Sequence, residues 1–138
     1  MSLRLALTAP MPERGEDIGI LSANWWKELE RLGLSRELLH RAAVCLLEGE
    51  SNTALYGRNG SASLTVDEDT LELTFRDEGP GIPDPEEAVT PGFTTADASC
   101  RALGYGGGMG LANLRRFSDE LSLTSGAEGT VLRVRISL

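Results

Sequence analysis

The stretch Asp77-Glu78-Gly79-Pro80-Gly81-Ile82-Pro83-Asp84 carries the residue types in this chain that are best suited to chemistry. An alternating run, Leu71-Glu72-Leu73-Thr74-Phe75, precedes it and predicts a strand that delivers Asp77 to an edge. Gly79 and Gly81 leave open backbone where a side chain would obstruct a ligand. A carboxylate held at such a position can accept a hydrogen bond from an amine on a planar ring. The same residue types are common in acidic surface turns, so the stretch alone leaves both interpretations open.

Two further stretches carry residues of similar interest. Glu48 and Asn52 are four residues apart in a predicted helix, so both side chains point the same way, one turn apart. Downstream, Gly104-Tyr105-Gly106-Gly107-Gly108-Met109-Gly110-Leu111 runs into a predicted helix with a buried face. Glycines at a helix start present free backbone N–H groups, which makes an anion site. Alone this signal is weak, because the loop lacks the Gly-Lys-Ser/Thr ending of a Walker loop.

The elements that must position these residues follow from hydrophobic periodicity. Residues 3–9 predict a first strand, and a helix from about Glu16 ends at Gly33 as its C-cap. Ser35 is the expected N-cap of the second helix, and His40 faces solvent on this interpretation. The apolar stripe of that helix is predicted to comprise Leu38, Leu39, Ala42, Ala43, Leu46 and Leu47.

The second half of the chain predicts a sheet. Residues 61–66 and 70–76 alternate like the strands of a hairpin, and residues 121–125 and 130–136 like a second antiparallel pair. In the last strand we expect Leu132, Val134 and Ile136 on one face, and Val131, Arg133 and Arg135 on the other. Between the pairs, residues 84–88 predict a short helix. Residues 90–107 predict a mobile loop, and a loop of this length is usually either functional or disordered.

Composition excludes several classes of function. The length of 138 residues suits one domain with a real core. A formal charge of −8 argues against nucleic acid or an anionic membrane as the main partner. The apolar runs are too short to span a membrane and the start lacks a secretory signal, so a cytoplasmic location is expected. Cys45 and Cys100 form neither a disulfide framework nor a metal cluster with His40.

Together, the helix with Glu48 and Asn52, the Asp77-x-Gly79-x-Gly81 strand end and the Gly106-x-Gly108-x-Gly110 loop resemble the Bergerat-fold (GHKL) ATPases. This superfamily includes gyrase, the Hsp90 chaperones, sensor histidine kinases and the MutL proteins. The match covers roughly residues 35–136.

One branch of the superfamily is most similar. Pro91-Gly92-Phe93-Thr94-Thr95, Gly108-Met109-Gly110-Leu111, Phe117-Ser118-Asp119-Glu120 and Gly129-Thr130 resemble stretches of the bacterial anti-sigma-factor and serine-protein-kinase proteins. Those proteins act in partner-switching pathways.

The resemblance implies a role for each matching residue. Asn52 resembles the Mg²⁺ ligand, since an amide oxygen suits a hard cation. Glu48 resembles the general base, with Glu50 a neighbouring rival. Asp77 resembles the adenine reader. The remaining positions implied to contact ATP are Gly79, Gly81, Thr94, Thr95, Gly106, Gly108, Met109, Gly110, Leu111 and Thr130.

Some features depart from the branch or have no assigned role. Gly49 lies between the acid and the amide at a cost of about 1 kcal/mol in helix stability, and we expect it to permit close packing against the ligand. The lid around residues 90–110 is longer than usual in the branch. The roles of Arg115, Arg116 and Cys100 stay open, and a solvated helix face is the expectation for the two arginines.

The resulting hypothesis is a single domain, residues 1–138, with an α/β (α+β) two-layer sandwich in which helices cover one face of a mostly antiparallel sheet. Its expected function is that of an ATP- and Mg²⁺-dependent kinase that phosphorylates a serine or threonine of a small antagonist protein. The alternative is an ATP-binding module that sequesters a sigma factor or docks in a signalling complex without catalysis. A third hypothesis is a globular domain that binds no nucleotide. The resemblance also makes a homodimer plausible.

Overall fold

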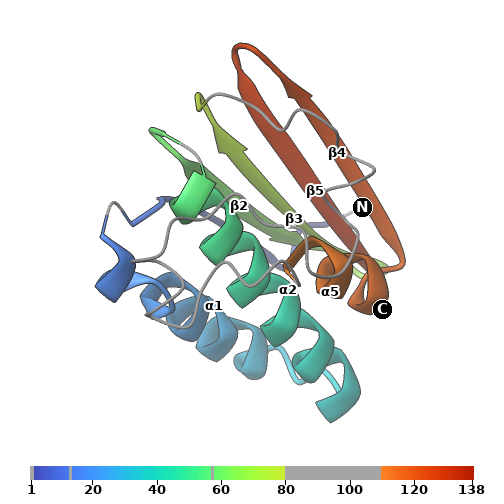
Figure 1. Cartoon of the computed structure of the whole chain (residues 1–138). Coiled ribbons are helices and arrows are strands. Elements are labelled where there is room, and N and C mark those ends of the chain that lie inside the picture. The colour runs from blue at the N-terminus through green and yellow to red at the C-terminus, as the bar shows by residue number, and fades with distance from the viewer. Residues whose placement is uncertain (1, 13, 57, 80–109) are drawn as a thin grey trace.

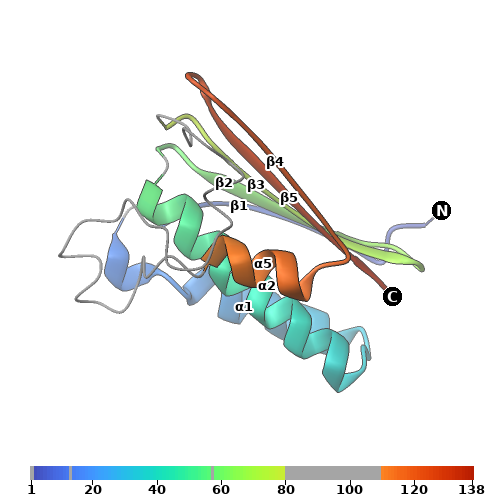
Figure 2. The same cartoon turned by 45° about the vertical axis from the view of Figure 1, so that its right-hand side comes forward.

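The computed structural model of the chain describes residues 2–12, 14–56, 58–79 and 110–138. In it, five antiparallel strands form one sheet in the order β1-β2-β3-β5-β4. Their bounds are β1 Leu5–Pro10, β2 Ser61–Val66, β3 Thr70–Asp77, β4 Glu120–Gly126 and β5 Gly129–Ser137. All the labelled helices lie on one side of the sheet (Figures 1 and 2). The predicted two-layer α+β architecture is therefore confirmed.

In the part of the chain that the structure describes, the helical layer comprises a short 3-10 turn and three α-helices. Their bounds are η1 Gly15–Asp17, α1 Ile20–Arg31, α2 Arg36–Tyr56 and α5 Gly110–Phe117. The predicted caps are present: Gly33 has a φ of 75°, and Oγ of Ser35 accepts a hydrogen bond from N of Leu38 at 3.2 Å. The first helix begins later than predicted, because Gly19 with a φ of 106° separates η1 from α1.

The sheet buries one face against the helices. In β5, Leu132, Val134 and Ile136 are buried while Arg133 and Arg135 are exposed, as the alternation predicts. The largest fully buried side chains come from both layers and include Leu29, Leu46, Leu64, Leu71, Leu73, Phe75 and Leu114. The core therefore lies between the helices and the inner face of the sheet.

The predicted core stripe of α2 is wrong at one position. Leu47 is 41% exposed, whereas Cys45 is fully buried. Successive helix positions differ by about 100°, so the stripe that faces the sheet runs through Ala42, Cys45 and Leu46 and turns away from Leu47. Burial raises the pKa of the Cys45 thiol to about 12. We therefore regard Cys45 as a packing residue.

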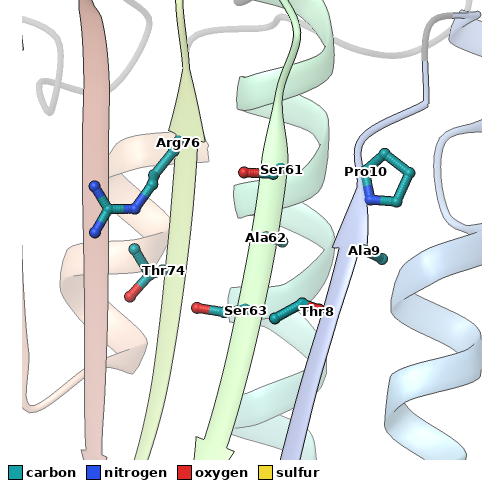
Figure 3. Close-up of a pocket in the computed structure, with 8 residues that line it drawn as sticks. All are labelled: Thr8, Ala9, Pro10, Ser61, Ala62, Ser63, Thr74 and Arg76. Atoms are coloured by element: carbon teal, nitrogen blue, oxygen red, sulfur yellow. The ribbon is translucent and has the colours of Figure 1, made fainter.

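None of the helices formed by the described residues lies on the opposite face of the sheet. A depression of about 450 Å³ lies there over β1, β2 and β3, and the helices pass behind these strands in Figure 3. It is lined by Thr8, Ala9, Pro10, Ser61, Ala62, Ser63, Thr74 and Arg76. This depression includes none of the predicted site residues. Within the described ranges, no helix is long and apolar enough to cross a membrane.

Candidate functional site

Asp77 is the last residue of β3 and lies on the inner, helix-facing side of the sheet, in the same alternation as Phe75. Its Oδ1 accepts a hydrogen bond from the backbone N–H of Gly79 at 2.7 Å. Partial burial raises the pKa of the Asp77 carboxyl, and the Gly79 hydrogen bond opposes this rise. Among the described residues, Oδ2 of Asp77 has no hydrogen-bond partner. One acceptor oxygen is thus fixed by the backbone and the other can meet a ligand.

The start of β5 packs closely against Asp77. Thr130 is buried and is the direct cross-strand partner of Asp77, so both side chains share the inner face. Gly129 has a φ of 136°, and a β-carbon there would lie 2.9 Å from the carbonyl carbon of Asp77 and closer still to its oxygen. Only glycine permits this approach. The structure therefore brings together Asp77, Gly79 and Thr130, which the sequence predicted to share a site.

The turn after α2 is tied to the segment after Asp77. N of Glu78 donates to O of Arg58 at 2.8 Å, and Nδ2 of Asn59 donates to Oε2 of Glu78 at 2.9 Å. These bonds hold the carboxyl end of β3 beside the end of the helix that carries Glu48 and Asn52.

Glu48 faces the beginning of α5. Its Oε2 would lie 2.9 Å from a β-carbon built on Gly110, and Nδ2 of Asn113 donates to its Oε1 at 3.5 Å. Partial burial raises the pKa of the Glu48 carboxyl, with the Asn113 hydrogen bond acting in the opposite direction. Asn52 follows one turn later on α2 and is half-buried. Periodicity could not have found Asn113, because nothing local in the sequence pairs α5 with α2.

Glu50, the alternative candidate for the general base, has a structural role. Its side chain is fully buried, and it accepts hydrogen bonds from N of Gly19 at 3.0 Å and from N and Oγ of Ser22 at 3.0 and 2.6 Å. These donors lie at the start of α1, where backbone N–H groups lack intrahelical partners. Glu50 therefore caps α1, and Glu48 is the acid on the α5 side of α2.

The predicted reason for Gly49 is wrong. Gly49 is buried against the ring of Phe75 on β3, where a β-carbon would not fit. The glycine thus allows α2 to approach the sheet, and the ligand is not needed to explain it.

α5 presents its first turn to Glu48 and its last turn to α2. The Leu111 side chain is buried in the core, which leaves only the backbone of this residue for a ligand. At the other end, Arg41 bonds O of Phe117 through Nε and Oδ1 of Asp119 through Nη2, each at 3.1 Å. The sequence did not indicate these two interactions of Arg41. They fix the end of α5 against α2. Arg115 and Arg116 are exposed, as expected, and the Arg116 guanidinium lies 5.3 Å from the Phe117 ring centroid.

The remaining predicted site residues lie outside the described ranges. They are Gly81, Thr94, Thr95, Gly106, Gly108 and Met109, together with the predicted helix 84–88, the lid and Cys100.

This geometry can be compared with known proteins. The family described as histidine kinase-like ATPase domain matches residues 16–136. The chain belongs to this family. Membership implies an ATP-binding site, and the sites around Asp77 and Glu48 lie within the matched range.

Several anti-sigma F factors are similar to this chain in sequence. That of Bacillus licheniformis is 36% identical over 94 residues, covering 63% of this chain and 61% of that protein. That of Bacillus subtilis strain 168 is 40% identical over 73 residues, covering 52% and 47%. That of Heyndrickxia coagulans is 43% identical over 70 residues, covering 50% and 44%. The chain therefore matches between 44% and 61% of the length of these relatives. The predicted resemblance to the anti-sigma-factor branch is confirmed.

Solved structures share the fold at low identity. The mycobacterial sensor histidine kinase MprB superposes with a TM-score of 0.55 at 16% identity, covering 96% of this chain and 97% of that one. A histidine kinase domain from Erythrobacter litoralis EL346 gives 0.51 at 19% identity, covering 90% and 60%. These likenesses support the Bergerat fold alone.

Proposed function

We propose that this protein is an ATP-dependent kinase that phosphorylates a serine or threonine of a small antagonist protein in a partner-switching pathway. The proposal combines membership in an ATPase family, relatives named anti-sigma F factor, and the arrangement of Asp77, Glu48 and α5. Residues 1–138 would form the single catalytic domain, with residues 90–110 as its lid.

The described residues fit a Mg²⁺-bound adenine nucleotide. At one end of the site, Oδ2 of Asp77 is unengaged within the described ranges and can accept an amine hydrogen. At the other end, the first turn of α5 supplies backbone N–H groups suited to phosphate oxygens. One turn after Glu48 on α2, Asn52 offers an amide oxygen of the kind that Mg²⁺ accepts while it retains several waters.

Each residue then has a definite role. Asp77 would accept a hydrogen bond from the adenine amine. Gly79 and Thr130 would line the space beside the adenine ring, and Gly81 would extend that lining. Asn52 would hold Mg²⁺, and Gly110 and Leu111 would meet phosphate through their backbone. The bound Mg²⁺ nucleotide supplies the phosphoryl group and neutralises its charge. The remaining predicted lid residues, Thr94, Thr95, Gly106, Gly108 and Met109, would close over the phosphates.

The observation that carries the proposal is the position of Glu48 at the start of α5. A carboxylate beside an anion site repels phosphate and weakens binding, so its placement there needs a reason. As a general base it would take the proton from the partner's hydroxyl where that hydroxyl meets the phosphates. Burial raises the pKa of Glu48 above its ordinary value and so toward neutral pH, which suits a residue that accepts a proton and releases it again.

The test is phosphotransfer from Mg-ATP to a candidate antagonist protein. We expect Glu48→Gln to lower the rate at least ~100-fold, the contribution typical of a general base, while ADP binds at least as tightly as it does to the wild type. Glu37→Gln is a matched control, because Glu37 is exposed in the first turn of the same helix. A Glu48→Gln variant as active as the wild type would overturn the assignment.

The names of the relatives also favour a second function, a nucleotide-binding module that sequesters a sigma factor without catalysis. Wild-type protein that binds Mg-ATP and a sigma factor but transfers no phosphate to any antagonist would support this module. A dimer measured in solution would be compatible with either function.

A further inference from the structure

One flank of α5 lies along α2 and carries Gly110, Asn113 and Phe117, which are spaced three and four residues apart. At one end of this flank, Nε of Arg41 on α2 donates to O of Phe117 at 3.1 Å. At the other end, Gly110 and Asn113 both face Glu48. Glu48 follows Arg41 by seven residues, and α5 has the same spacing between its two ends, so the helices run antiparallel in one fixed register.

The Glu48 carboxylate lies across the first turn of α5, and its two oxygens have different surroundings. Oε1 accepts a hydrogen bond from Nδ2 of Asn113 at 3.5 Å. Oε2 would lie 2.9 Å from a β-carbon built on Gly110, so the glycine leaves this oxygen uncovered. In the part of the chain that the structure describes, the Asn113 amide is the one hydrogen-bond partner of the Glu48 carboxylate.

The chemistry of the two groups fixes the direction of their contact. An ionised carboxylate only accepts hydrogen bonds, so the amide of Asn113 must turn its NH₂ group toward Glu48. A carboxylate that rotates freely offers either oxygen to a substrate, whereas one with Oε1 held offers Oε2. Oε2 is the oxygen on the side of Gly110, whose backbone is proposed to meet the nucleotide phosphates.

We propose that Asn113 is a positioning residue for the general base: it holds Oε1 of Glu48 and so directs Oε2 at the reacting hydroxyl of the partner protein. In that reaction the hydroxyl oxygen bonds to the γ-phosphorus, the bond from phosphorus to ADP breaks, and the hydroxyl proton passes to Oε2. The effect of Asn113 is exerted through Glu48. The inference rests on the proposed function, and neither the sequence motifs nor the family resemblance indicated Asn113.

The contact can be tested without nucleotide by carbon-13 NMR titration of the Glu48 side chain. The Asn113 hydrogen bond lowers the pKa of the Glu48 carboxyl against the effect of burial, so its removal should raise that pKa further. We expect Asn113→Leu, which has a similar shape and no donor, to raise it, and Asn113→Asp to raise it more, because a second carboxylate would face Glu48. Cys45, one turn earlier on α2, stays neutral during this titration because its pKa is about 12.

Phosphotransfer from Mg-ATP to a candidate antagonist protein tests the role in catalysis. The hydrogen bond is long for an N–H donor, so Asn113→Leu should lower kcat only about three- to tenfold and change the ADP dissociation constant less than about twofold. In a Glu48→Gln background, Asn113→Leu should lower kcat no further, because the group that it positions is gone.

Asn24→Leu is the matched control, because Asn24 is an exposed amide on another helix, α1. It should leave both the pKa of Glu48 and kcat at their wild-type values. Melting temperatures without nucleotide verify that each variant folds.

Two results would overturn the role of Asn113 while the proposed kinase stands. They are an unchanged Glu48 pKa or an unchanged kcat in Asn113→Leu, and losses of kcat that multiply in the double mutant. Wild-type protein that binds Mg-ATP but phosphorylates no antagonist would instead reject the proposed function and, with it, this role of Asn113.

Discussion

Gly49 on α2 lies directly against the ring of Phe75 on β3, with no space for a side chain between them. A β-carbon on Gly49 would lie 2.8 Å from Cδ2 of Phe75 and closer still to Cε2 and Cζ. Gly49 adjoins Glu48, and Phe75 precedes Asp77 by two residues. The contact therefore sets the separation between α2, which carries the proposed general base Glu48, and β3, which carries Asp77, the proposed acceptor for the adenine amine.

Replacing Gly49 by alanine should destabilise the protein despite the better helix propensity of alanine. Propensity favours the variant by about 1 kcal/mol, whereas overpacking a buried contact costs about 1–3 kcal/mol, and here the obstacle is a fully buried ring. We expect a net loss of about 1–2 kcal/mol in urea unfolding. ADP affinity should fall as well, because α2 must move away from β3.

Phe75→Leu provides the matching rescue. It should cost less in the Gly49→Ala background than in the wild type, because the smaller side chain makes room for the new methyl group. Gly126→Ala is the control, since nothing lies within 4 Å of a β-carbon there. If Gly49→Ala is as stable as Gly126→Ala, the contact does not set the separation.

Glu50→Gln should destabilise the fold strongly. The amide group of glutamine would place N–H donors against backbone N–H groups that now donate to the Glu50 carboxylate. Loss of buried hydrogen bonds to a charged group costs about 1.5–3 kcal/mol, which denaturant unfolding can measure. Hydrogen exchange should report the loss first at the start of α1. An exposed acid on the same helix, Glu37, changed to glutamine should alter stability by less than ~0.5 kcal/mol.

Glu48→Gln should stabilise the ligand-free protein at neutral pH. Burial raises the pKa of Glu48 above its ordinary 4.5, so its protonated form favours the folded state, and this contribution is lost as pH rises through the folded-state pKa. Glutamine at position 48 stays neutral at every pH, so the variant does not lose this stability when the pH rises. Melting temperatures measured from pH 4 to pH 8 should show a variant that exceeds the wild type at pH 7 and converges with it near pH 4. A constant difference across this range would contradict the burial argument.

Asp77→Asn should abolish most nucleotide affinity while the fold persists. One of its two oxygens becomes a donor, so the residue can no longer accept both from Gly79 and from a ligand amine. A hydrogen bond to a charged group is worth about 1.5–3 kcal/mol, which predicts a loss of roughly 10- to 100-fold in ADP affinity. Thermal-shift titration with Mg-ADP measures it. Asp69→Asn, in the exposed β2–β3 turn, should bind as the wild type does.

Local patterns predicted much of this fold. Strand alternation identified the buried face of β5, and Ser35 and Gly33 marked the ends of two helices because capping depends on neighbours in the chain. Asp77 and Thr130 were both predicted as site residues, and their strands are paired. These signals depend on residues close in sequence or on a family motif.

The errors arose where distant segments meet. Gly49 was assigned to the ligand because the sequence does not reveal which aromatic ring α2 approaches. Leu47 was placed in the core because an apolar residue at the margin of a helix stripe can face either way, and the sheet covers only one side of α2. The capping role of Glu50 required the position of α1 relative to α2. Each depends on tertiary packing, which periodicity does not describe.

The pairing of β3 with β5 also bears on how the protein is made. Asp77 and its cross-strand partner Thr130 are separated in sequence by the predicted loop, by α5 and by β4. Such long-range contacts form late, since loop closure must precede them. A nascent chain that has emerged only as far as β4 already carries Asp77 and Glu48. It still lacks β5, the strand that carries Thr130 and pairs with β3. Nucleotide bound at this site therefore cannot assist the folding of the domain before β5 has been made, and can stabilise it only after β5 has paired with β3.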